Sequence, residues 1–240
     1  MTRRRRRLAG GPVALALGGA VALALGVVAL AGPAGASGIL DFVSFDGIDY
    51  IRWAEEPGRA LTASDLGMEF ATVGCSLGED LRGCPYGVDA GAAFMPAGTR
   101  LYAVRGYATE FRLAAISQGR IFLYQAWRNP RARTGGDLFD IVGKVRAIEV
   151  QQGEPTSAAA GQRVTIEVPQ EVATLVDLMV HAPVRRPVAH AAGETRYWLT
   201  LWLRDGTSLG RPYFAETGEL LGGVVMPAEF RAILERRLSE

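Results

Sequence analysis

The hydrophobic pattern of the chain begins with a long apolar run that carries no charge between Arg7 and Asp41. Residues 13–31 consist only of Val, Ala, Leu and Gly. This is about the length that a helix needs to cross a hydrocarbon layer of roughly 30 Å. The pattern therefore predicts a hydrophobic helix at the N-terminus, followed by a folded region with a different periodicity.

Alternating apolar and polar residues predict short strands and tight turns in the first half of that region. FVSF and IDYIRW flank Asp46-Gly47, a pair suited to the positive backbone angles of a hairpin turn. A second hairpin is expected with its tip at residues 117–120, and further strands at 100–104 and within 138–152. Together these predict a mainly antiparallel sheet or a small barrel.

The second half has helical periodicity as well as strands. Residues 151–162 are rich in Gly, Pro, Ser and Ala and predict a surface loop. Beyond it, apolar residues recur every three or four positions after Pro169 and after Pro227, which predicts two helices with prolines at their starts. A hairpin is expected across Asp205-Gly206. We therefore expect an α+β fold, a mainly antiparallel sheet with two amphipathic helices in the C-terminal half.

These elements divide the chain into three segments. Residues 1–36 form a signal peptide or membrane anchor, residues 37–152 a β-rich half, and residues 161–240 an α+β half. The two halves can also belong to one continuous domain.

The N-terminal segment predicts export across a membrane. Arg3 to Arg7 precede the apolar run, and no comparable cluster follows it, so the arginines should stay cytoplasmic and the remainder should be translocated. Ala34-Gly35-Ala36 is a small-x-small site of the kind that signal peptidases accept. The length of the apolar run favours retention instead. We expect an extracytoplasmic protein, either secreted after cleavage near Ala36 or anchored in the cytoplasmic membrane through residues 1–36.

Charge and cysteine content narrow the function. Without the first 36 residues the chain has 21 basic and 25 acidic residues, near −4, which argues against nucleic acid as a partner. Cys75 and Cys84 are the only cysteines, and in an oxidising compartment such a close pair predicts a disulfide.

Candidate catalytic residues are few. Gly74-Cys75-Ser76-Leu77-Gly78 fits the G-x-S-x-G pattern of a nucleophilic serine, but Gly83 and Pro85 interrupt the long helix that this motif requires. The acidic pairs Glu55-Glu56 and Glu79-Asp80 could supply carboxylates for hydrolysis only if the fold brought them together. His181 and His190 have no compact set of metal ligands beside them, so we expect no metal site and no cofactor.

Two groups of residues are candidates for binding. Arginines crowd two loops and could bind an anion or a partner such as an envelope polymer; they are Arg128, Arg131, Arg133, Arg185 and Arg186. Solvated loops in an arginine-rich protein would have the same pattern. Trp198 and Trp202 share one face of a predicted strand and form either a binding platform or a wall of the core.

Five stretches resemble segments of uncharacterised exported bacterial proteins. They are FDGIDY, DLGMEFATV, AGTRLYAVRGY, FRLAA and DGTSLGRPYFAETGELLGGVVMPAEF. The resemblance covers roughly Asp41 to Leu238 and implies export, with no activity or site residues to carry over.

The sequence thus favours an exported, envelope-facing binding or interaction module that is not an enzyme. The alternatives are an extracytoplasmic hydrolase that uses Ser76 or a dispersed carboxylate pair, and a structural partner of another membrane protein.

Overall fold

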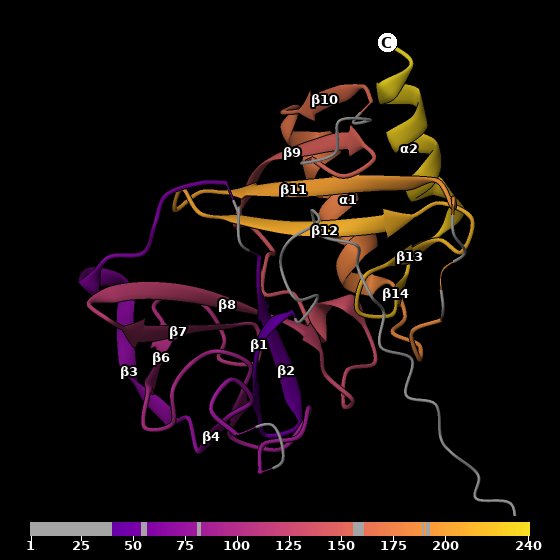
Figure 1. Ribbon diagram of the computed structural model, residues 1–240. Coiled ribbons are helices and arrows are strands. Elements are labelled where there is room, and N and C mark those ends of the chain that lie inside the picture. Colours follow the sequence, from indigo (N-terminus) through magenta and orange to yellow (C-terminus); the bar gives the residue numbers. More distant parts are fainter. Residues whose placement is uncertain (1–39, 54–56, 81–82, 156–160, 189, 191–192) are drawn as a thin grey trace, which may run out of the picture.

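The computed structural model describes residues 40–53, 57–80, 83–155, 161–188, 190 and 193–240 (Figure 1). The expected N-terminal hydrophobic helix lies outside the described residues. The strands and helices, in chain order, are β1 (Asp41–Phe45), β2 (Ile48–Arg52), η1 (Ala63–Asp65), β3 (Leu66–Thr72), β4 (Cys75–Ser76), β5 (Gly91–Ala92), β6 (Arg100–Val104), β7 (Arg112–Ser117), β8 (Arg120–Arg128), η2 (Gly135–Asp137), β9 (Val145–Gln152), β10 (Arg163–Ile166), α1 (Pro169–His181), β11 (Arg196–Leu203), β12 (Ser208–Phe214), β13 (Glu219–Leu220), β14 (Val224–Val225) and α2 (Ala228–Leu238). The expected α+β class, mainly antiparallel with two C-terminal helices, is confirmed.

The first eight strands form one curled sheet, which we call the barrel lobe. Its strand order is β3-β6-β7-β8-β2-β1-β5-β4. β3 and β4, the two ends of this sheet, are separated in the chain only by Val73 and Gly74, so the sheet must curl back on itself. The ring of Phe70 on β3 lies 6.3 Å from that of Phe45 on β1. Apolar side chains such as Tyr124 and Leu113 fill the interior.

The turns that were expected in this lobe are confirmed. Asp46 and Gly47 link β1 to β2 with φ values of 50° and 71°. Gln118 and Gly119 link β7 to β8 with φ values of 51° and 72°. Tight hairpins need positive φ at both central positions, and Asp-Gly and Gln-Gly end in the residue that adopts it most readily.

The second sheet and both helices form the helix-covered lobe. The strand order is β10-β9-β11-β12-β13-β14. Leu199, Leu201 and Leu203 of β11 share a core with the apolar stripes of α1 and α2. The residues that were expected to face inward from these helices are all buried: Val172, Leu175, Val176, Met179, Val180, Phe230, Ile233, Leu234 and Leu238. None of the described helices is both long and apolar enough to span a bilayer.

β9 lies in a different sheet from the one its place in the sequence suggested. The sequence groups it with the strands before residue 152, but β9 hydrogen-bonds only to β10 and β11. The alternation of apolar and polar residues predicts a strand here, but it does not indicate which strand will pair with it. The change of lobe therefore falls between β8 and β9, ahead of the Gly- and Pro-rich loop.

The two lobes meet through buried polar groups. The Arg112 guanidinium of β7 donates to Thr207 Oγ1 at 2.8 Å and to the Ser208 carbonyl at 2.6 Å. Gln125 Nε2 of β8 donates to the same carbonyl at 2.8 Å. Phe111, the residue before β7, packs into the core of the helix-covered lobe. Strand pairing stays within each lobe, while side chains cross between them.

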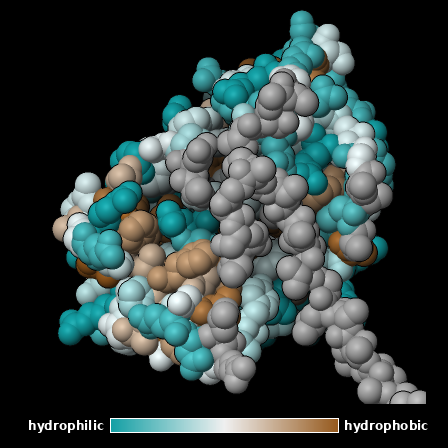
Figure 2. All heavy atoms as spheres, viewed as in Figure 1, coloured by the Kyte–Doolittle hydropathy of each residue, from teal (hydrophilic) through white to brown (hydrophobic). Residues whose placement is uncertain are grey.

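The barrel lobe exposes several large apolar side chains. Met68 is 84% exposed, and Tyr86, Phe94 and Phe70 are also exposed. Figure 2 shows apolar surface on this lobe, on the left of the view.

Candidate functional site

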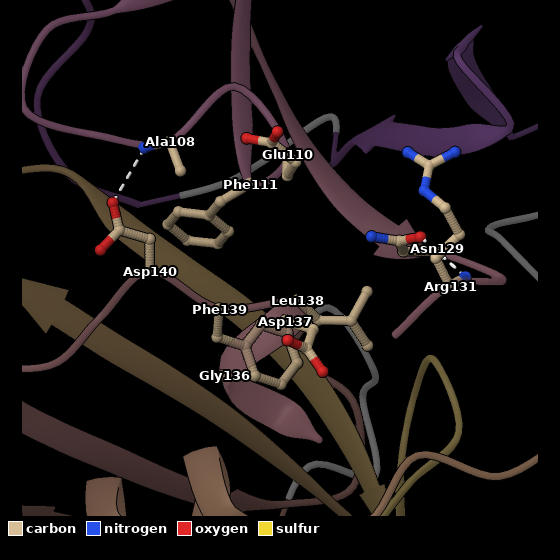
Figure 3. A pocket seen from close by; sticks show the side chains of 10 residues that line it. All are labelled: Ala108, Glu110, Phe111, Asn129, Arg131, Gly136, Asp137, Leu138, Phe139 and Asp140. Atoms are coloured by element: carbon tan, nitrogen blue, oxygen red, sulfur yellow. Dashed lines mark hydrogen bonds between the residues drawn. The ribbon is translucent and has the colours of Figure 1, made fainter. Parts of the chain in front are cut away.

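A pocket of about 250 Å³ lies where two loops meet at the junction of the lobes (Figure 3), and we call it the junction pocket. One loop precedes β7, and the other joins β8 to β9 and includes η2. The lining residues are Ala108, Glu110, Phe111, Asn129, Arg131, Gly136, Asp137, Leu138, Phe139 and Asp140. Phe111 and Phe139, both almost fully buried, form the floor, and the other walls carry carboxylates, one amide and the Arg131 guanidinium.

The η2 wall is fixed by a capped turn and by close packing on α1. Asp137 Oδ2 accepts hydrogen bonds from the backbone of Thr134 at 2.9 Å and of Arg133 at 2.8 Å. These bonds hold the pKa of Asp137 below its usual value, with Thr134 contributing most. Gly135 N donates to the Ala182 carbonyl, and a Cβ on Gly135 would lie 1.9 Å from the Met179 carbonyl oxygen. Only glycine permits this approach.

The wall before β7 is held from both lobes. Ala108 N donates to Asp140 at 2.8 Å, and Asp140 also pairs with Lys144 at 2.5 Å. Tyr50 Oη donates to the Thr109 carbonyl at 3.0 Å from inside the barrel. Burial, aided by the charge of Glu110, raises the pKa of Tyr50, so it remains a donor at neutral pH.

Asn129 is the one deeply buried polar side chain in the pocket lining, only 8% exposed. Its Oδ1 accepts the Arg131 backbone N–H at 3.0 Å, which fixes which end of the amide is oxygen. Figure 3 shows the opposite end, Nδ2, directed toward the cavity. Within the described part of the chain this NH₂ group has no hydrogen-bond partner.

Two carboxylates of the pocket have no cation within ion-pair distance in the described residues. Asp140 is neutralised by Lys144. Glu110 is exposed and, among the described residues, accepts a hydrogen bond only from Thr109 Oγ1, at 3.2 Å. Asp137 has hydrogen bonds at Oδ2 alone. The pocket therefore offers acceptors on two walls and a donor on the third.

The expected arginine group separates into two kinds. Arg128 pairs with buried Asp49 at 2.6 Å, and Arg131 pairs with Asp46 at 2.8 Å. These two guanidinium groups hold the end of β8 to the first hairpin. Their charges are already compensated.

The other three arginines lie on adjoining backbone segments, and we call them the arginine rim: Arg133, Arg185 and Arg186. Val184 N donates to the Arg133 carbonyl at 2.8 Å, and Thr134 forms an isolated antiparallel β-bridge with Pro183. Arg185 N donates to the Gly223 carbonyl at 2.8 Å. All three side chains are exposed, and none lies within 4.0 Å of a carboxylate of the described residues. The fold thus joins two loops about fifty residues apart in sequence.

Trp198 and Trp202 lie on the face of β11 away from the helices. Tyr197, on the opposite face, belongs to the helix-packed core. Trp198 makes an edge contact with Trp53 of the barrel lobe at 5.1 Å and lies against Gly210. Trp202 lies 5.5 Å from the Arg146 guanidinium. Both tryptophans are half-buried.

His190 is buried between two glutamates, which the sequence did not indicate. Its Nδ1 lies 3.2 Å from Glu194 and its Nε2 3.8 Å from Glu219, and its ring stacks on Phe214 with a centroid distance of 3.4 Å. Burial raises the pKa of Glu219. Spacing could have suggested only Glu194, four residues away. His181, by contrast, is exposed beside Asp177.

Ser76 does not have the geometry of a nucleophile elbow. It is 3% exposed, and its hydroxyl donates to the Ala93 carbonyl at 3.5 Å. The disulfide between Cys75 and Cys84 is present, with Cα atoms 5.6 Å apart, and it holds this turn.

The expected carboxylate pairs do not form a described site. Glu55 and Glu56 lie outside the described residues. Glu79 accepts a hydrogen bond from Ala97 N at 3.2 Å, and Asp80 accepts one from Gly83 N at 2.9 Å, so these neighbours serve different turns. Across the described ranges, no group of three or more His, Cys, Asp or Glu residues could hold a metal ion.

Of the residues that line the junction pocket, only Arg131 was a candidate from the sequence, and there as a residue that could bind an anion or a partner. Asn129, Glu110 and Asp137 belong to no motif, and their separation in the chain gives no signal that they converge. No protein-family model matches the chain, and neither a curated protein nor a solved structure is significantly similar to it.

Proposed function

We propose that this protein is an exported binding module whose arginine rim, Arg133, Arg185 and Arg186, engages an anionic partner outside the cytoplasmic membrane. The observation that carries the proposal is the backbone contact between the two arginine loops, with Val184 N bonded to the Arg133 carbonyl. Three uncompensated guanidinium groups on adjoining segments attract an anion more strongly than three dispersed ones.

The remaining charge distribution supports the same interpretation. The region after residue 36 is net acidic as a whole, so three arginines without an ion pair among the described residues differ in sign from its overall charge. Arg128 and Arg131 are bound to Asp49 and Asp46, and they serve to position the loop that carries Arg133. A guanidinium binds carboxylate and phosphate oxygens in a fork geometry, so an acidic envelope polymer fits this surface.

Export is proposed from the sequence. The cationic start and apolar run of residues 1–31 are typical of a segment that directs translocation, and the Cys75–Cys84 disulfide suits an oxidising compartment. Intact-mass measurement of the protein from its host would determine whether the chain begins at Ser37.

The anion proposal is tested by retention on immobilised polyphosphate and polygalacturonate, with uncharged dextran as the blank. Retention should weaken with salt, because the screening length falls from about 10 Å at 0.1 M to about 3 Å at 1 M. Replacing the three rim arginines with Gln should abolish most of it. The control replaces Arg100, Arg105 and Arg120, which are exposed on the barrel lobe, and changes net charge equally. Equal losses in the two triple variants would mean that net charge, and not the rim, determines binding.

A further inference from the structure

The unpaired NH₂ group of Asn129 points to a ligand for the junction pocket. Polar groups of side chains as buried as Asn129 usually have a protein partner. Among the described residues its NH₂ group has none and stays open to the pocket. Asn129 cannot rotate its amide to escape, because its Oδ1 holds the Arg131 backbone N–H. The pocket is thus prepared to donate a hydrogen bond to something that occupies it.

The opposite walls determine which ligand class fits. Glu110 and Asp137 accept hydrogen bonds and carry negative charge without a paired cation in the described residues. An anion would be repelled by both carboxylates, and the guanidinium of Arg131 in the lining is already paired with Asp46. A simple ammonium ion has no lone pair to accept from Asn129, and an apolar group would leave the donor and both acceptors unpaired.

A neutral hydroxyl group satisfies both requirements at once. It accepts from the Asn129 NH₂ group and donates to a carboxylate. The ring of Phe111, which Figure 3 shows at the cavity, is only 2% exposed, so it contributes an apolar edge beside these polar groups, where a C–H group of the ligand can lie. A volume of about 250 Å³ suits a single small ligand.

We infer that the junction pocket binds one sugar residue through its hydroxyl groups. Asn129 is the donor, Glu110 and Asp137 are the acceptors, and the exposed edge of Phe111 is an apolar part of the lining. Arg133, which donates its backbone N–H to Asp137 at 2.8 Å, connects the pocket to the arginine rim. Resting on the proposed function, this inference narrows the anionic partner to an acidic glycan, with a sugar ring in the pocket and its charge at the rim.

The chain offers a single-residue probe, because Asn129 is its only asparagine. Labelling with [¹⁵N]asparagine gives one side-chain NH₂ signal in a nitrogen–proton NMR spectrum. The full-length protein, in a detergent without a sugar head group, would be titrated with glucose, galactose, N-acetylglucosamine and glucuronate. We expect a saturable shift of this signal with at least one sugar and none with acetate.

The matched variant is Asn129→Asp, which keeps the Oδ1 acceptor and the side-chain shape but replaces the donor with an acceptor. We expect its affinity for the responding sugar to fall about tenfold or more by calorimetry. Gln170→Glu, the same chemical change at an exposed position of α1, should leave affinity unchanged.

Two outcomes would overturn the inference. One is that no sugar shifts the Asn129 side-chain signal, and the other is that Asn129→Asp keeps the full affinity for the responding sugar. A shift with methylammonium that Glu110→Gln abolishes would assign the pocket to a cation instead. Neutral sugars do not need the arginine rim, and polyphosphate does not need the pocket, so the two proposals fail in different experiments.

Discussion

The guanidinium of Arg112 donates to Thr207 Oγ1 at 2.8 Å in the buried interface between the two lobes. Its side chain is fully buried, and Asp205, at 4.0 Å, lies on the same turn as Thr207. This contact, together with the bond from Arg112 to the Ser208 carbonyl, sets the position of β7 against β12. The junction pocket lies beside this interface, because Phe111, the residue before Arg112, lines it.

Arg112→Ala should lower the free energy of unfolding by about 3–5 kcal/mol, because it leaves buried polar groups without their partner. Urea denaturation followed by circular dichroism would measure the loss. Arg100→Ala is the control, since Arg100 is two-thirds exposed beside Glu69 and such pairs contribute about 0–1 kcal/mol. Similar costs for the two substitutions would contradict a structural role for the buried arginine.

Reduction of the Cys75–Cys84 bond should lower stability by about 2.5 kcal/mol, the chain-entropy contribution of a loop of about ten residues. The comparison is between denaturation curves of oxidised and reduced protein, with Cys75→Ser/Cys84→Ser as an independent variant. Because this bond holds a turn of the barrel lobe, sugar and polyanion binding should persist. Thiol labelling of both cysteines in native protein recovered from its host would argue against the bond.

Glu171 should make the stability of the fold depend on pH in the acidic range. Its hydrogen bond from Arg237, aided by Arg236, lowers the pKa of Glu171 and ties α1 to α2. A lowered folded pKa means that this stability is present above the unfolded value of about 4.3 and is lost as the pH falls through the folded value.

Glu171→Gln should therefore be less stable than the wild type at pH 7, by about 1 kcal/mol. The difference should vanish in strong acid, where both side chains are neutral. Thermal unfolding between pH 7 and pH 2 would show the convergence. Glu229→Gln on α2 serves as a control for the loss of a carboxylate. If the stability difference between the wild type and Glu171→Gln did not change with pH, the ionised Glu171 would not be the source of that stability.

Gly135→Ala should destabilise the protein by about 2 kcal/mol or more, because the new Cβ would lie 1.9 Å from the Met179 carbonyl oxygen and force η2 away from α1. Gly136→Ala is the neighbouring control, with its closest contact at 3.3 Å to the Val180 carbonyl. Thermal unfolding would compare them. Moving η2 also shifts Asp137, so Gly135→Ala should weaken any ligand of the junction pocket, and unchanged binding would contradict this placement of the wall.

Local elements were predictable because each depends on neighbouring residues. Asp46-Gly47 favours positive φ whatever surrounds it, and the stripe from Val172 to Val180 produces an apolar face as soon as a helix forms. The eight residues between Cys75 and Cys84 leave a loop short enough to close. In each case the residues that interact lie within ten positions of one another in the sequence.

Partners across the fold were not predictable in this way. β9 pairs with β11 because its register and buried face fit there, which alternation alone cannot specify. Asn129, Glu110 and Asp137 converge only because η2 packs on α1 and β7 packs on β12, and His190 meets Glu219 by a similar long-range approach.

Sequence patterns were enough to predict the hairpin turns, the two C-terminal helices, the disulfide and the arginine-rich loops, and the export signal is a further prediction from them. Tertiary structure alone decided which arginines are neutralised, which remain available, and where a pocket opens. The physical reason is range. Backbone preferences and hydrophobic periodicity act over a few residues, whereas ion pairing and cavity shape depend on segments that only the packed core brings together.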